Sequence, residues 1–172
     1  MALPSFLTER MKANISEDNE KLTIKIDNPH ITETCMLFRM NGYTQFYDEN
    51  KDYIAFIKLV APKEKPIKLI HVSPIKNKEK ILKEGLLAHI PEKGWKVKGV
   101  YFHNGRRDMA SLVGVADRAG TKGDFAVFMM KKVPENLFYD PQEYNSKDCF
   151  LVENDIPPED FDFVGIFDRS KT

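Results

Sequence analysis

Residues 71–86 constrain the fold of this chain most, because they set a histidine between an apolar run and a short helix. The apolar residues 67–70 predict a strand, and the His-Val-Ser segment that begins at His71 ends it. Asn77 is placed to cap the following helix with its side-chain oxygen, and Gly85 supplies the left-handed position at the helix end. The pattern therefore predicts a buried strand that delivers His71 to its end, directly before a helix.

The rest of the chain is rich in predicted strands and poor in helices, which indicates an α+β fold. The polar stretch 61–66 runs between two prolines and predicts a boundary between residues 1–64 and residues 65–172. We expect the first part to be a β-rich extension behind one helix, and the second to be the core. In the first part we expect a helix at 4–14 and strands at 22–26, 34–40 and 53–60. In the second part we expect strands at 100–103, 125–131, 149–152 and 163–167 and a helix at 107–118.

Composition excludes several classes of protein. Lys and Arg together number 26, as do Asp and Glu, so the formal net charge is zero and bulk charge does not hold the chain to nucleic acid. Two cysteines do not make a disulfide scaffold, and no cofactor metal is expected from the spacing of His and Cys. Since the sequence carries no leader-like or membrane-spanning apolar run, we expect a cytoplasmic protein, or one delivered into another cell's cytoplasm.

Two segments together resemble the ADP-ribosyltransferase fold, in the branch shared by diphtheria toxin and the poly(ADP-ribose) polymerases. Members carry a histidine and a serine on the first core strand, then an Asn, an Ile-Leu pair and Gly-Leu. A Gly-(Ile/Val)-Tyr-Phe motif follows on a later strand. The matching residues here are His71, Ser73, Asn77, Ile81, Leu82, Gly85 and Leu86, and then residues 99–102.

The resemblance implies a split, strongly twisted β-sandwich that binds NAD as a substrate. It implies transfer of ADP-ribose to a macromolecular acceptor, protein or nucleic acid, with release of nicotinamide. In the family the histidine bonds a ribose hydroxyl, the next residue's backbone holds the nicotinamide amide, and the tyrosine lines the nicotinamide pocket. The implied NAD-binding residues are therefore His71, Val72, Ser73, Tyr101 and Phe102, with His71 and Tyr101 on the walls of one cleft.

A glutamate at the start of a late strand normally completes this site, and here that position falls on Cys149. If the chain is an active transferase, another carboxylate must reach the sugar, because the transition state resembles an oxocarbenium ion. The candidates are Glu153, then Asp148, then Glu143. Glu153 comes first because a regular strand points it to the same face as Cys149, whereas Asp148 points to the opposite face.

Two alternatives stay open beside the transferase. The cysteine at the glutamate position favours a catalytically degenerate relative that binds a nucleotide or a protein. The segment 150–159 is similar to the last strands of the RNA 2′-phosphotransferases and of toxins that modify single-stranded DNA, which favours a 2′-phosphotransferase. A 2′-phosphotransferase would use several arginines and a further histidine. The candidates are Arg106, Arg107, Arg118 and His103.

Overall fold

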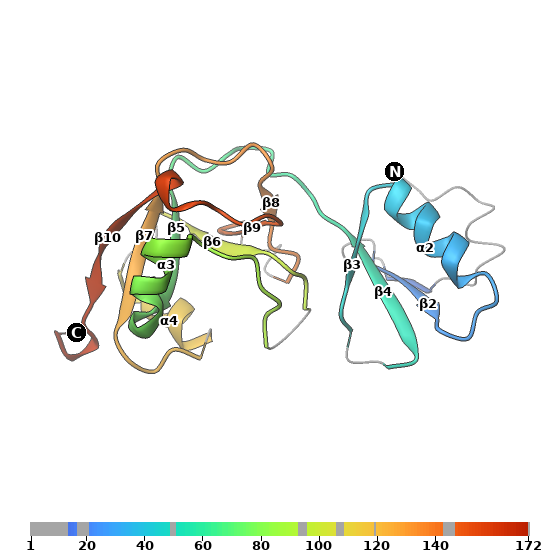
Figure 1. The fold of residues 1–172 in the computed structure, drawn as a ribbon, viewed down its shortest axis with the longest axis horizontal. Coiled ribbons are helices and arrows are strands. Elements are labelled where there is room, and N and C mark those ends of the chain that lie inside the picture. Colours follow the sequence, from blue (N-terminus) through green and yellow to red (C-terminus); the bar gives the residue numbers. More distant parts are fainter. Residues whose placement is uncertain are drawn as a thin grey trace. The chain divides into compact units, whose positions relative to one another are not determined.

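The computed structural model describes residues 14–16, 21–48, 51–92, 96–105, 109–118, 120–142 and 147–171. The chain divides into two compact units, drawn in Figure 1. The first takes the described residues up to Val60 and those within 90–98, and the second takes the remainder. The segment 90–98 belongs to the first unit, where Lys96 forms an isolated antiparallel bridge with Tyr47.

The first unit is an antiparallel sheet with one helix against it (Figure 1). Its strands lie in the order β1-β2-β4-β3. Their bounds are Asn14–Ser16 for β1, Lys21–Lys25 for β2, Tyr43–Phe46 for β3 and Tyr53–Lys58 for β4, and helix α2 spans Ile31–Met40. The expected helix at 4–14 lies outside the described residues, except that Asn14 begins β1.

The prediction of a strand at 34–40 is wrong, because these residues lie in α2. The buried members of α2 include Cys35 and Phe38, whose spacing fits one helix face and not the alternation of a strand. Phe38 packs edge-on against Phe56 of β4, with ring centroids 5.1 Å apart. The apolar run by itself does not distinguish the spacing of a helix from that of a strand. The distinction depends on which of its residues pack against the sheet.

The second unit contains a six-stranded antiparallel sheet in the order β10-β7-β5-β6-β9-β8. The strands are β5 (Leu69–Pro74), β6 (Val100–Asn104), β7 (Phe125–Met130), β8 (Phe138–Tyr139), β9 (Cys149–Val152) and β10 (Phe161–Phe167). The helices are α3 (Lys78–Glu84) and α4 (Met109–Arg118), with short 3₁₀ turns at Ile75–Asn77, Pro158–Asp160 and Arg169–Lys171. Two open antiparallel sheets with few helices agree with the predicted α+β class.

Apolar side chains fill both faces of this sheet, and a helix lies over each (Figure 1). Ile81 of α3 belongs to the cluster on one face, together with Leu69 and Phe102. Leu112 of α4 belongs to the cluster on the other face, together with Ile70. Neighbouring residues of β5 thus enter opposite clusters, as the alternation of a strand requires.

Strand β5 parts from β6 almost as soon as it begins. It pairs with β6 only at Leu69↔Asn104 and Ile70↔His103, whereas it stays paired with β7 from Ile70 to Pro74. Strand β6 meanwhile stays paired with β9 from His103 back to Val100. The β5–β6 ladder therefore ends at Ile70, one residue before His71.

The segment around His71 differs from the prediction in two details. Strand β5 runs from Leu69 to Pro74, because its pairing with β7 continues to Pro74, so His71 lies within the strand and not at its end. Asn77 precedes α3 but its side chain makes no capping bond; instead its Nδ2 donates to Ser73 Oγ at 3.3 Å. Gly85 ends the helix with a φ of 91°, and its N–H donates to Ile81 O at 2.8 Å. Leu86 then forms a bridge with Ile156, so the chain turns sharply at Gly85 to meet the segment after β9.

We expect Gly85→Ala to destabilise the second unit by about 2–4 kcal/mol. The positive φ is costly for an L-residue, and a new Cβ would meet the Ile156 carbonyl and lie 3.2 Å from Pro157 Cα. Gly114→Ala in α4 is the control, since its Cβ would meet nothing within 4 Å and alanine favours a helix interior. Urea unfolding followed by circular dichroism should show opposite shifts; equal midpoints would contradict the packing at Gly85.

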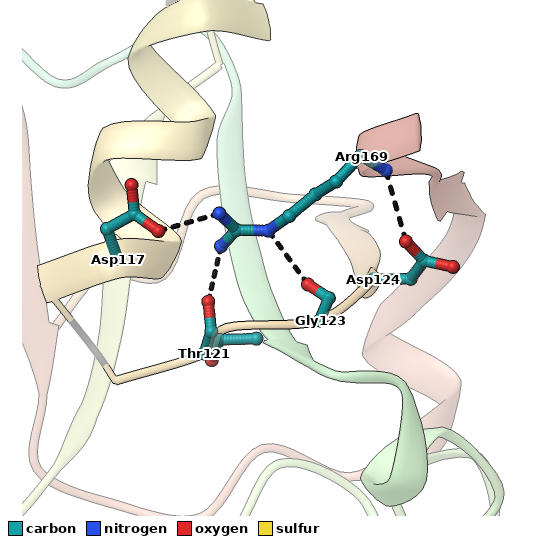
Figure 2. Close-up of polar contacts among 5 residues, drawn as sticks. All are labelled: Asp117, Thr121, Gly123, Asp124 and Arg169. Atoms are coloured by element: carbon teal, nitrogen blue, oxygen red, sulfur yellow. Dashed lines mark hydrogen bonds and ion pairs between the residues drawn. The ribbon is translucent and has the colours of Figure 1, made fainter. Parts of the chain in front are cut away.

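Arg169, just after β10, ties the C-terminal turn to the segment between α4 and β7 (Figure 2). Its Nη1 donates to Asp117 Oδ1 at 2.6 Å, its Nε donates to Gly123 O at 2.9 Å, and its Nη2 donates to Thr121 O. Its backbone N–H donates to Asp124 Oδ1 at 3.0 Å. One planar guanidinium thus serves three acceptors that lie in different directions.

Arg169→Lys should lower the free energy of unfolding by about 1–3 kcal/mol, since an ammonium group cannot reproduce the three-way fork. Lys171→Ala is the matched control, because that lysine's side chain is 82% exposed and its pairing with Asp168 is worth little. Thermal unfolding of both variants measures the difference. If the hydrogen bonds of Arg169 contribute nothing to stability, the two variants will unfold at the same midpoint temperature.

Candidate functional site

The His71 side chain is held at the point where β5 leaves β6. Its Nδ1 lies 2.7 Å from the backbone oxygen of Tyr101 on β6. A carbonyl oxygen only accepts hydrogen bonds, so Nδ1 carries the proton and donates it. The imidazole thus takes the place that a backbone N–H would fill if the β5–β6 ladder continued. This bond fixes the ring orientation and, when the ring is neutral, its tautomer.

The His71 ring is neutral at physiological pH. Burial lowers its pKa to about 4, with the Tyr101 carbonyl acting in the opposite direction and the nearby charge of His89 adding to the lowering. With the proton on Nδ1, the Nε2 atom is a hydrogen-bond acceptor. Within the described part of the chain, Nε2 has no partner and no buried side-chain nitrogen or oxygen lacks one. The Nε2 atom therefore reaches the molecular surface.

Two pairs of aromatic rings form at β6. The His71 ring lies edge-on to Phe102, with centroids 5.9 Å apart, and the His89 ring lies edge-on to Tyr101 at 6.3 Å. His89 is positioned by a bridge with Gly99, through N–H to O bonds of 3.1 and 3.0 Å. From the sequence His89 is expected to be a surface residue, and its link to the segment before β6 depends on the tertiary structure.

The structure joins His71 and Tyr101 through a side chain and a backbone oxygen. Tyr101 and Phe102 are neighbours on β6 and turn to opposite faces, and His71 packs against Phe102. What joins His71 to Tyr101 is the bond to the Tyr101 backbone oxygen. That both side chains line one cleft stays a prediction; the imidazole lies where β5 leaves β6, and the phenol ring lies beside His89.

Tyr101 is half-buried, and its phenol stays protonated across the physiological range. Burial raises its pKa most, and the negative charge of Asp140 raises it further. The ring thus presents a neutral aromatic surface beside His89. Asp140, which follows β8, was not among the carboxylates that the sequence singled out.

The other expected NAD-binding residues have structural surroundings. Ser73 is 5% exposed, and its hydroxyl accepts the bond from Asn77. Phe102 is 1% exposed within the apolar cluster on the α3 face of the sheet, and Val72 packs against the cluster on the α4 face. Their side chains therefore support the core, and any part in binding would fall to the backbone at Val72.

The expected carboxylates lie at the two ends of β9. Asp148 precedes the strand, where its Oδ1 lies 3.4 Å from the donating Nδ2 of Asn104. Glu153 follows Val152, whose partner on β6 is Val100. Glu143 lies outside the described residues.

Cys149, at the position where the resemblance expects the glutamate, is 2% exposed. Its Sγ lies 3.5 Å from Nδ1 of His103, its register partner on β6. The cysteine is thus buried, and a base lies beside it in space although none lies near it in the sequence. The two residues are 46 positions apart, so only strand register brings them together.

Two hollows of the second unit lie away from His71 and Tyr101. One, of about 440 Å³, is lined by Lys131, Lys132, Asn154 and neighbouring residues, and the other, of about 230 Å³, by Lys65, Tyr139 and others. Among the described residues no three His, Cys, Asp or Glu side chains gather as metal ligands. The side chains of Arg106, Arg107 and Arg118 lie outside those that the structure describes.

Comparison with known proteins adds no family to this geometry. No protein-family model matches the chain, and no curated protein matches it. Of the helices in the described ranges, none is long and apolar enough to cross a membrane. The interpretation of the site therefore depends on its residues and their contacts.

The low pKa of His71 predicts that the folded protein becomes less stable as the pH is lowered. The unfolded chain takes up a proton near pH 6.5 and the folded chain near pH 4, so stability is lost as the pH falls through that window. Between pH 7 and pH 5 the loss should be about 2 kcal/mol. His71→Asn is the control, because its amide nitrogen can still donate to Tyr101 O but does not titrate.

Urea unfolding at both pH values measures this difference. The wild type should lose about 2 kcal/mol more than His71→Asn between pH 7 and pH 5. An equal loss in the two proteins would mean that His71 accepts a proton as readily when folded as when unfolded.

Proposed function

We propose that the second unit binds NAD where β5 leaves β6 and transfers its ADP-ribose group to a macromolecular acceptor, with release of nicotinamide. The observation that carries this proposal is the His71 imidazole, tied through Nδ1 to the Tyr101 carbonyl at 2.7 Å with Nε2 at the surface. A neutral Nε2 accepts a hydrogen bond from a sugar hydroxyl. That is the role that the resemblance gives to this histidine.

The strand pattern also supports the proposal. A sheet in which β5 follows β7 and β6 follows β9 has two halves joined at Leu69 and Ile70. A separation within the strand that carries the histidine is in keeping with the split β-sandwich that the resemblance implies. The neutral ring of Tyr101, edge-on to His89, offers an aromatic surface for a nicotinamide ring.

The chemistry asks little of the protein beyond position and charge. Nicotinamide is a good leaving group, so the site must orient the sugar, exclude water and stabilise the positive charge that develops on the ribose. His71 would orient the sugar through Nε2, and its low pKa keeps a second positive charge away from that ribose. The His71–Tyr101 bond would hold this orientation without a contribution from the ligand.

One observation favours a second candidate function, binding of a nucleotide without transfer. The residue at the glutamate position, Cys149, is buried and faces His103, so β9 offers no carboxylate to the sugar there. A 2′-phosphotransferase has no comparable support, because the side chains of its candidate arginines lie outside the described residues.

NAD should bind the wild-type protein in isothermal titration calorimetry, and His71→Asn should weaken binding roughly two- to tenfold. The variant keeps a donor for Tyr101 O but loses the Nε2 acceptor, and one hydrogen bond to a neutral group is worth about 0.5–1.5 kcal/mol. His30→Asn is the matched control, because the side chain of His30 is exposed in the first unit, where its Nδ1 lies 3.5 Å from a Glu33 carboxylate oxygen. It should leave the affinity unchanged.

The same titration separates the candidates. No binding of NAD by the wild type at millimolar concentration would contradict both the transferase and the nucleotide-binding function. Binding with release of nicotinamide, measured by chromatography with and without cell lysate as the source of acceptor, supports the transferase. Binding without release in either condition supports the binding function alone.

A further inference from the structure

A carboxylate reaches the sheet face that carries Tyr101 from a strand that the sequence did not suggest. Strand β8 pairs with β9 at Phe138↔Leu151 and Tyr139↔Phe150. The next residue, Asp140, continues the ladder, because its N–H donates to Cys149 O at 3.0 Å. Asp140 therefore stands beside Cys149, one strand further from β6.

Register then places these residues on one face of the sheet. Residues that stand opposite one another on antiparallel strands share a face, so Asp140, Cys149 and His103 form one row across β8, β9 and β6. Tyr101 stands opposite Leu151, two residues along β9 from Cys149, and so lies on the same face. The contrast with Asp148 is clear, since that residue precedes Cys149 and bonds with Asn104.

The carboxylate of Asp140 is oriented and acts on this face. Its Oδ1 accepts the backbone N–H of Gln142 at 3.0 Å, an Asx turn that limits rotation of the side chain. Its negative charge is the second cause, after burial, of the raised pKa of Tyr101. The charge of Asp140 is thus felt at the phenol ring, as the register requires.

We infer that Asp140 supplies, from β8, the carboxylate that the proposed transfer needs and that β9 lacks at Cys149. The inference rests on the proposed function and names a catalytic residue for it. The bond between ribose C1′ and the nicotinamide nitrogen breaks, and its electron pair leaves with nicotinamide. A bond forms from the acceptor's heteroatom to C1′, and the acceptor's proton passes to the Asp140 carboxylate and then to solvent. The same carboxylate stabilises the positive charge on the ribose.

The test compares three single variants of the full chain in nicotinamide release from NAD and in NAD binding by calorimetry. Asp140→Asn removes the charge but keeps an oxygen for the Gln142 N–H, so the Asx turn should survive. We expect it to slow release by a factor of about 100 or more while NAD affinity changes less than about threefold. Asp148→Asn and Glu153→Gln, the matched controls at the ends of β9, should keep release within about threefold.

Each outcome decides the inference. Wild-type release in Asp140→Asn, or a larger loss in either control, overturns the role of Asp140 and leaves the transferase intact. Wild-type protein that binds NAD but releases no nicotinamide, with lysate or without, overturns the transferase and Asp140's role together. If Asp140→Asn does not fold by circular dichroism, Asp140→Ser replaces it, because serine can also make the turn without a charge. A folded Asp140→Ser with wild-type release likewise overturns the inference.

Discussion

The candidate site depends on one constraint, the end of the β5–β6 ladder at Ile70. Beyond it, β5 follows β7 and β6 follows β9, and the backbone ladder between β5 and β6 does not reach Tyr101. Leaving a buried carbonyl unsatisfied costs about 1–3 kcal/mol, and the Nδ1–H of His71 donates to the Tyr101 carbonyl from its side chain. The tautomer and orientation of His71 are therefore consequences of sheet geometry, and a ligand need not induce them.

The same constraint links stability to chemistry. The environment that keeps His71 uncharged also makes the ring sensitive to acid, because a proton on Nε2 would have to be accommodated in a largely buried place. For the proposed transfer a neutral imidazole is favourable, because the ribose gains positive charge as nicotinamide leaves. His89 acts in the same direction, since its own charge disfavours a second charge on His71. The site thus keeps a neutral acceptor at the cost of stability in acid.

Sequence predicted the parts of the fold that local pattern determines. The strand 149–152 matches β9, and the runs at 100–103, 125–131 and 163–167 each overlap an observed strand. The predictions that failed depend on tertiary contacts. Residues 34–40 form a helix whose buried face packs Phe38 against Phe56. The side chain of Asn77 bonds with Ser73 and does not cap α3. The His103–Cys149 contact and the place of Asp140 depend on register between strands distant in sequence, which composition and spacing do not encode. His71 was found from sequence because its neighbours in the chain carry the signal.

Moving a carboxylate by one strand changes its effect without removing it. Adjacent strands lie about 4.8 Å apart, so a charge at Asp140 stands about that much further from a sugar near Tyr101 than a charge at Cys149 would. With an effective dielectric constant of about 20, two unit charges attract by about 4 kcal/mol at 4 Å and by about 2 kcal/mol at 9 Å. A neutral buried thiol contributes none of this attraction. A carboxylate on β8 therefore keeps roughly half of the electrostatic stabilisation that a carboxylate at position 149 would give to the same sugar.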